Sequence, residues 1–335
     1  MAPLGSPQGR LRPFQTRNVF QPPPVRRGGD PTQRRFGLAE GAVRSLGEFL
    51  HQLASGLALG GVYAIMALAL VMIYQATHLI NFAQGEMAMF STYFAWKLMD
   101  MGEPYWFAFL ATVIASFIAG IVIERLIVRP FANAPVLASV IVFIGLGLIF
   151  NSLAGWLYGY SVTSFDSPFT GRPWFGAGYM SAHEAGAVVV TLCVLALVYA
   201  FFSFTPLGLA MRAAAQNPES SRLVGIRVGW MLAIGWGLAA AIGSVAGMMA
   251  APIVYLDPNM MGGVLLYAFA GAVLGGIDNS FGAAFGGVAV GVLGNLIGAY
   301  LVGDEVKLSV ALAIIIAVLV WRPSGLFGRR LVARV

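Results

Sequence analysis

The stretch that decides the fold is GWMLAIGWGLAAAIGSVAGMMAA, which occupies residues 229–251. It contains no charged side chain, and it is slightly longer than the roughly 20 apolar residues that a helix needs to cross a bilayer core of about 30 Å. Inside lipid the backbone polar groups must be satisfied within the segment, so we expect a helix rather than a strand. The run therefore predicts a membrane-spanning helix.

Further apolar segments lie on both sides of this run. With it they form a series: Phe49–Ile73, Ile80–Met99, Tyr105–Val128, Val136–Tyr158, Glu184–Phe204, Gly229–Ala251, Gly262–Gly276, Phe281–Val302 and Val306–Trp321. Of the 335 residues, 59% are hydrophobic and 10% charged, whereas a soluble domain carries about 25% charged residues. The sequence thus predicts an all-α, polytopic transmembrane helical bundle of about 8–9 segments, over residues 49–328.

The two ends of the chain differ in composition from this apolar region. Residues 1–48 are rich in Pro, Gly and Arg and have no apolar periodicity, so we expect a disordered tail that is either dispensable or in contact with anionic lipid. Residues 329–335 are expected to form a short basic tail. No apolar stretch of the secretory-signal type follows Met1.

Charge, cysteine and motif content exclude several function classes. The formal net charge of +6 comes from arginines that flank apolar segments, which favours helix orientation over nucleic-acid binding. Cys193 is the single cysteine, and three scattered histidines offer no metal cluster. The sequence contains no GxxxxGK[ST] phosphate loop and no recognisable catalytic constellation. We therefore expect a non-enzyme with no cofactor or metal of its own.

The arginines that follow the tail predict the orientation of the segments. They gather in a few loops and at the C-terminus: Arg125 and Arg129, then Arg212, Arg222 and Arg227, then Arg322, Arg329 and Arg330. By the positive-inside rule these loops are cytoplasmic, and residues 159–182 form the longest external loop. Nine full crossings would place the N-terminus outside, against the rule. A re-entrant or broken Ile80–Met99 would restore an internal N-terminus with eight crossings, and we favour that count.

Residues 74–90, YQATHLINFAQGEMAMF, bring polar side chains into an apolar run. Asn81, Gln84 and Glu86 lie inside it or at its edge, where a carboxylate costs several kcal/mol unless it finds a partner or water. Such residues either line an interior path or stitch a break between helices. The pattern leaves both interpretations open.

Residues 205–225, TPLGLAMRAAAQNPESSRLVG, connect two apolar segments on the expected cytoplasmic side. Asn217 is suited to an N-cap, Pro218 to the first helical position and Glu219 to the first turn, and Gly225 stands where a helix stop belongs. The pattern predicts a short surface helix. Either it offers Glu219, Ser221 and Leu223 to a partner, or it only reverses the chain.

Glycines at four-residue spacing predict close helix contacts near the C-terminus. The pairs are Gly271/Gly275, Gly282/Gly286, Gly287/Gly291 and Gly294/Gly298. We favour packing within one subunit, and a contact between subunits is the alternative.

Several motifs together resemble one family. They are INFAQGE at 80–86, GLAMRA at 208–213, GIRV at 225–228, LGGIDNSFGAAFGG at 274–287 and RPSGLFG at 322–328. The chain from about Phe49 onward is similar to the branched-chain amino-acid permeases of bacterial ABC importers. Gln84 stands where many relatives have His, which argues against a proton-dependent role at this position.

The resemblance implies a multi-pass subunit of the bacterial inner membrane with the importer permease fold. Its partners would be a second related permease, two cytoplasmic ATPase subunits that bind ATP, and an external substrate-binding protein. The ATPases would contact a coupling loop containing Gly208, Arg212, Pro218, Glu219, Ser221, Leu223 and Gly225. Asn81, Gln84 and Glu86 would belong to the translocation path or a helix break.

The expected cargo is leucine, isoleucine and valine, moved by alternating access. Urea or short amides, which similar permeases carry, are the alternative cargo. A secondary transporter or channel is the rival from another class, and it would require ion-coupling carboxylates, for which Glu86 and Glu124 are the candidates.

Overall fold

The computed structural model describes residues 31–132, 134–171, 179–303, 306–322 and 324–328. The chain divides into two units, residues 1–44 and 45–335. Helix α1 (Pro31–Thr77) begins in the first unit and continues into the second. Residues 31–48 are therefore helical where the composition indicated a disordered tail. Their sequence after Pro31 is free of proline, and proline itself is favoured at the first position of a helix. Residues 1–30 and 329–335 lie outside the described part.

The second unit is built from helices, and the all-α prediction is confirmed for the described residues. After α1 they are α2 (Gln84–Asp100), α3 (Tyr105–Ile123), α4 (Val136–Tyr158), α6 (Ala182–Phe204), α7 (Pro206–Gln216), α8 (Pro218–Leu223), α9 (Val228–Val254), α10 (Met260–Gly275), α11 (Ser280–Ile297) and α12 (Lys307–Trp321). A π-helical turn (Glu124–Val128) and a 3₁₀ turn (Arg129–Phe131) extend α3, and a second π turn (Gly298–Val302) extends α11.

Six of the described helical segments are long and apolar enough to cross a membrane. They are Leu46–Thr77, Tyr105–Phe131, Val136–Tyr158, Ala182–Phe204, Val228–Val254 and Ser280–Leu301. Helices α10 and α12 are apolar but shorter, and α2, with 17 residues, carries Glu86, Lys97 and Asp100. Each of the nine predicted apolar segments thus corresponds to a helix.

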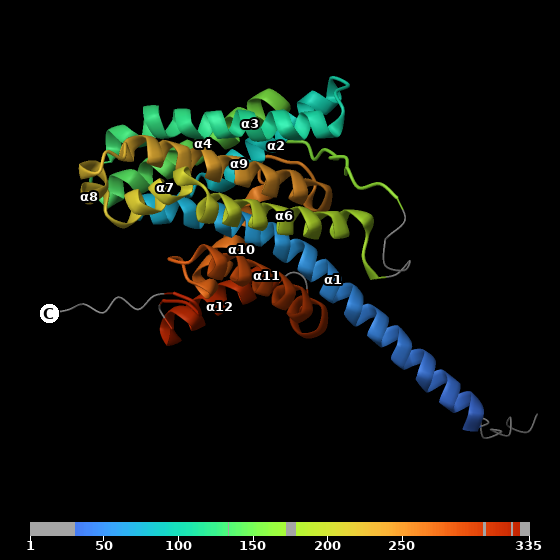
Figure 1. Ribbon diagram of the computed structural model, residues 1–335. Coiled ribbons are helices and arrows are strands. Elements are labelled where there is room, and N and C mark those ends of the chain that lie inside the picture. The colour runs from blue at the N-terminus through green and yellow to red at the C-terminus, as the bar shows by residue number, and fades with distance from the viewer. Residues whose placement is uncertain (1–30, 133, 172–178, 304–305, 323, 329–335) are drawn as a thin grey trace, which may run out of the picture. The chain divides into compact units, whose positions relative to one another are not determined.

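Helices α1 and α9 form the centre of the second unit. Most of their apolar windows are buried, whereas α3, α4 and α6 expose most of theirs. In Figure 1, α9 lies between α3 and α6, and it contacts both. The exposed apolar side chains of α3, α4 and α6 form the surface that lipid tails would cover.

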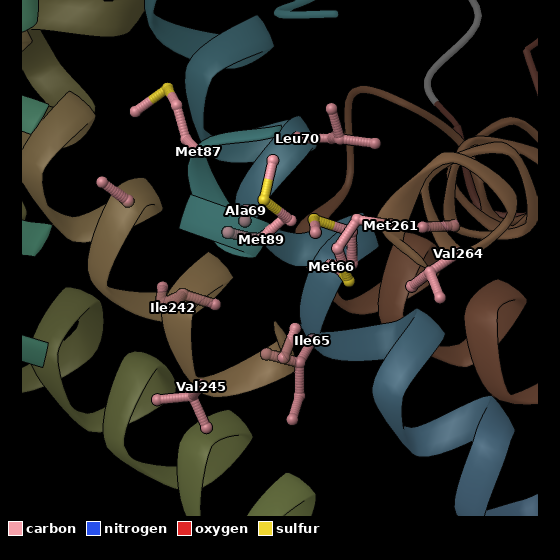
Figure 2. Close-up of a cluster of buried hydrophobic side chains, with 14 of the residues drawn as sticks. Ile65, Met66, Ala69, Leu70, Met87, Met89, Ile242, Val245, Met261 and Val264 are labelled. Atoms are coloured by element: carbon pink, nitrogen blue, oxygen red, sulfur yellow. The ribbon is translucent and has the colours of Figure 1, made fainter. Parts of the chain in front are cut away.

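The core between α1, α2, α9 and α10 is rich in aliphatic and methionine side chains (Figure 2). The side chains labelled there are Ile65, Met66, Ala69 and Leu70 of α1, Met87 and Met89 of α2, Ile242 and Val245 of α9, and Met261 and Val264 of α10. Methionine is flexible and fills irregular gaps. The short helix α2 is therefore enclosed by helices that come from distant parts of the sequence.

Glycines bring three helices into backbone contact. A Cβ atom added at Gly271 of α10 would lie 2.5 Å from the backbone of Gly287 in α11, and one added at Gly287 would lie 2.6 Å from the backbone of Ala64 in α1. Similar crowding occurs at Gly275, Gly282, Gly286 and Gly291. Packing within one subunit is therefore confirmed for three of the four predicted glycine pairs. At Gly294 an added Cβ would have nothing within 4 Å.

Contacts at the two ends of α1 establish its direction. We call the side that carries residues 205–227 the inner face and the side that carries residues 159–171 the outer face. Ser55, near the start of the spanning part of α1, donates a hydrogen bond to Glu184 at the outer end of α6. At the other end, Gln75 Nε2 donates to the backbone oxygen of Asp278 at 3.1 Å, and Asp278 lines an inner-face cavity with Arg212.

Helix α1 therefore runs from the outer to the inner face, which differs from the expected internal start. The loop arginines agree with this direction, and only the arginines of residues 1–48 predicted the opposite one. The positive-inside rule is a bias in which the first segment does not always dominate. Ile80–Met99 is broken, because α2 begins only at Gln84 and residues 78–83 separate it from α1. With 17 residues, α2 is shorter than the six segments that are long enough to cross a membrane.

Candidate functional site

The polar stretch after α1 forms a break between two helices inside the bundle. His78 has a positive φ of 55°, a conformation that is uncommon outside glycine. Asn81 is fully buried. Its Oδ1 accepts a hydrogen bond from the backbone N–H of Ala83 at 3.0 Å, and its backbone oxygen accepts from the N–H of Gln84 at 3.2 Å. Asn81 thus satisfies backbone donors at the start of α2.

Gln84 joins this break to α9. The Asn81 amide donates to Gln84 Oε1 at 3.3 Å, and Gln84 Nε2 donates to the backbone oxygen of Ala239 at 2.9 Å. A Cβ atom added at Gly243 would lie 2.5 Å from Gln84 Nε2, so this glycine makes room for the amide. Both side chains are buried and bonded within the fold. Their geometry is that of residues that stitch a helix break.

Glu86 lies apart from these two residues. It is half-buried on another side of α2, and its Oε2 accepts a hydrogen bond from Asn151 Nδ2 of α4 at 3.3 Å. The same Asn151 amide lies 2.7 Å from the backbone oxygen of Pro258 and 3.2 Å from Asn259 Oδ1. The structure therefore brings Asn81 and Gln84 together and places Glu86 in a second polar cluster.

The turn between α9 and α10, which supplies Pro258 and Asn259 to this cluster, is paired with the loop of the outer face. Leu256 pairs with Thr163 through two backbone hydrogen bonds of 2.9 and 3.0 Å, and Tyr255 has a positive φ of 64°. Sequence reasoning missed Asn151 and Asn259. A signal for Asn151 was present, because it is a lone amide within the apolar run of α4.

Helix α7 is fixed against the membrane helices. Thr205 Oγ1 caps it by accepting from the N–H of Gly208 at 3.0 Å, and Met211 and Ala214 are buried. A Cβ atom at Gly208 would lie 2.7 Å from Cα of Phe202 in α6. Gly208 therefore permits the close turn between α6 and α7, while Arg212 is exposed and lines a cavity of ≈ 350 Å³ with Asp278.

Helix α8 begins and ends at the predicted residues. Asn217 Oδ1 accepts from the N–H of Ser220 at 2.9 Å, Pro218 occupies the first turn, and Gly225 has a φ of 86°. The N–H of Ile226 donates to the backbone oxygen of Ser221 at 3.0 Å. These bonds close both ends of a six-residue helix.

The exposed side of α8 differs in part from the prediction. Leu223 is 89% exposed and Val224 76%, whereas Ser221 is 4% exposed. Glu219 is exposed as well. Ser221 is therefore unavailable to a partner and anchors α8 instead, because in so short a helix one residue must face inward. Two neighbouring apolar side chains project from the inner face.

Glu124 does not stand alone in the membrane. Its two carboxylate oxygens lie 3.6 Å from Arg129 Nε and 3.7 Å from Arg125 Nε. The Arg125 guanidinium stacks on the ring of Trp230 at 3.8 Å from the centroid, which ties the end of α3 to the start of α9. A buried carboxylate held between two arginines is a structural ion pair, so Glu124 is unsuited to ion coupling.

Comparison with known proteins gives a consistent result. Residues 52–319 match the family described as "Branched-chain amino acid transport system / permease component". The high-affinity branched-chain amino acid transport system permease protein LivH of Salmonella typhimurium is 32% identical over 304 residues, which cover 86% of this chain and 98% of LivH. The corresponding permease protein BraD of Pseudomonas aeruginosa is 32% identical over 302 residues, with the same two coverages.

A more distant similarity comes from a solved structure, PsaBC from Streptococcus pneumoniae in complex with Fab. It aligns with 82% of this chain and 93% of its own, at 14% identity and a TM-score of 0.45. That similarity is too low to support an argument.

Proposed function

Because the chain belongs to the branched-chain amino acid transport system permease family, we propose that it moves leucine, isoleucine and valine inward through the membrane. It is a multi-pass membrane protein and a permease subunit of an ABC importer. The observation that carries the proposal is the family match, which extends over residues 52–319 and therefore includes the helix break, α7 and α8.

The complete transporter would contain further subunits. We propose a second related permease, two cytoplasmic ATPase subunits and an external substrate-binding protein. ATP would be bound by the ATPases alone, so this chain would carry no cofactor and catalyse no reaction. We propose no nucleic-acid partner for this chain.

The geometry of the inner face supports an ATPase contact at α8. Leu223 and Val224 are apolar, adjacent and largely exposed, and apolar side chains on one face of a helix can dock in a partner's hydrophobic groove. Ser221 is buried, and α8 contacts α7 and α9. A partner that moves α8 would therefore move the helices to which it is attached.

A continuous series of packed contacts leads from this contact toward the helix break. The Cε atom of Met211 in α7 would lie 3.5 Å from a Cβ atom added at Gly235 of α9. One helical turn further along α9, the backbone oxygen of Ala239 accepts the hydrogen bond of Gln84. ATP-driven closure of the ATPases would thus act on α9 and α2, and alternate the side to which the path opens.

The test of the coupling role is Leu223→Asp. A carboxylate placed in a partner groove costs several kcal/mol when it is buried without a counter-charge, and 1.4 kcal/mol already corresponds to a tenfold loss of affinity. Co-purification of the ATPase should fall at least tenfold and uptake should fall with it, while membrane levels stay normal. The matched control is Val162→Asp, which adds the same charge at an exposed position on the outer face.

Unchanged ATPase association and transport in Leu223→Asp would refute the coupling role of α8. The cargo is tested separately. The complete transporter is reconstituted in proteoliposomes, and ATP-dependent uptake of radiolabelled leucine or urea is measured. Uptake of urea without leucine would replace the proposed cargo.

A further inference from the structure

The cluster around Glu86 contains more hydrogen-bond acceptors than donors. The Asn151 amide has two N–H hydrogens, yet three acceptor oxygens lie within 3.3 Å of its nitrogen: Glu86 Oε2, the Pro258 backbone oxygen and Asn259 Oδ1. The other Glu86 oxygen, Oε1, accepts no hydrogen bond among the described residues and is open to a further partner. The site is therefore suited to a ligand that brings several N–H donors.

Among the described residues, the Glu86 carboxylate has no counter-ion. The ion pairs of the described residues involve Lys97, Arg125 and Arg129, and none includes Glu86. Asp257, in the same turn as Asn259, accepts the Asn259 N–H at 2.7 Å and adds a second carboxylate close enough to repel a charge on Glu86. A carboxylate at membrane depth costs several kcal/mol unless it meets a cation or water.

Aromatic side chains lie beside the polar cluster. Phe90 is one helical turn after Glu86 on the same side of α2, and Phe150 precedes Asn151 in α4. Their rings contact each other at a centroid distance of 5.3 Å, and both rings are only partly buried. The cluster thus joins an acceptor-rich, negative end to an apolar surface. An ammonium group attached to a short apolar side chain matches both parts.

We propose that Glu86, Asn151, Asn259 and the Pro258 carbonyl form a subsite that binds the primary ammonium group of the amino-acid cargo beside the turn between α9 and α10. The inference rests on the transport function proposed above and names the part of the cargo that this site recognises. Phe90 and Phe150 contact the aliphatic side chain. The three N–H donors of the ammonium satisfy the acceptors that Asn151 alone cannot.

The experiment measures equilibrium binding of tritiated leucine to the complete transporter in detergent. Two competitors distinguish recognition of the ammonium group from recognition of the carboxylate. Leucinamide keeps the ammonium group and lacks the carboxylate, whereas 4-methylpentanoate keeps the carboxylate and lacks the ammonium group. In the wild-type protein leucinamide should compete at least tenfold better. Glu86→Gln, which removes the charge and keeps the shape, should bind leucine at least tenfold more weakly and lose the preference for leucinamide, whereas Glu86→Asp should restore part of it.

The matched control is Glu103→Gln, which makes the same change at an exposed carboxylate in the turn after α2. It should bind leucine like the wild-type protein. Asn259→Leu removes one acceptor from an exposed position and should weaken leucine binding several-fold. This variant decides the question if Glu86→Gln fails to accumulate as a folded subunit.

Unchanged affinity and preference in Glu86→Gln and Asn259→Leu, with wild-type uptake of leucine intact, would overturn this inference alone. Restoration of leucine binding in Glu86→Gln by Na⁺ would overturn it as well, because the site would then hold a metal cation. Wild-type uptake of urea without amino acids would overturn both this inference and the proposed cargo.

Discussion

Replacing Gly287 by alanine tests the backbone contact between α11 and α1. The new Cβ would lie 2.6 Å from the Ala64 backbone, about 0.8 Å short of the 3.4 Å at which ordinary van der Waals contact begins. The neighbouring atoms are backbone and cannot rotate away, so the helices must separate. Overpacking of this kind typically costs about 1–3 kcal/mol.

Gly294→Ala is the matched control because it makes the same change on the same helix. Gly294 is also buried, but its added Cβ would have nothing within 4 Å. Both variants gain the same helix propensity, about 1 kcal/mol in water, so the difference between them isolates the contact. We expect Gly287→Ala to be less stable than Gly294→Ala by about 1–3 kcal/mol.

The assay is thermal denaturation of the detergent-purified subunit, followed by size-exclusion chromatography, with membrane levels measured in parallel. A difference of 1 kcal/mol moves the melting temperature by about 2–4 °C in proteins of 150–250 residues, so a gap of several degrees is expected. Equal melting temperatures would show that α1 and α11 are not in backbone contact, and the packing argument would fail.

Two further predictions concern the helix break and the tail. Gln84→Leu removes the hydrogen bond to Ala239 and leaves the buried Asn81 amide without its oxygen partner, so it should lower the free energy of unfolding by about 1–3 kcal/mol. The same substitution at Gln216, which is exposed, should be neutral in the melting assay. Equal effects at the two sites would contradict the stitching role of Gln84. Deletion of residues 1–44, which form a separate unit, should leave leucine uptake intact, and loss of uptake at normal membrane levels would show that the tail has a function.

Local signals predicted the helices and their ends. Uninterrupted apolar runs gave the membrane segments, and Asn217, Pro218 and Gly225 occupy the expected capping positions of α8 because capping depends on neighbouring residues. Ser221 was misjudged, since a six-residue helix is too short for its buried side to be read from periodicity.

Contacts between segments that are far apart in the chain could not be predicted from the sequence. Asn151 meets the Pro258 backbone across 107 positions, and only the packing of α4 against the turn after α9 brings them together. The direction of α1 was mispredicted for a related reason. It follows from the pairing of Ser55 with Glu184 and of Gln75 with Asp278, whereas the arginines of the N-terminal tail indicated the opposite side.

The glycine contacts between α1, α10 and α11 also limit how the subunit can deform. Where backbones touch, no side chain is available to change rotamer and absorb a displacement. We therefore expect the spanning part of α1 (Leu46–Thr77) to shift together with α10 and α11, and relative motion within the subunit to fall to segments that lack such contacts. Residues 78–83 and 255–259, each with a non-glycine residue at positive φ, are natural hinges for that motion.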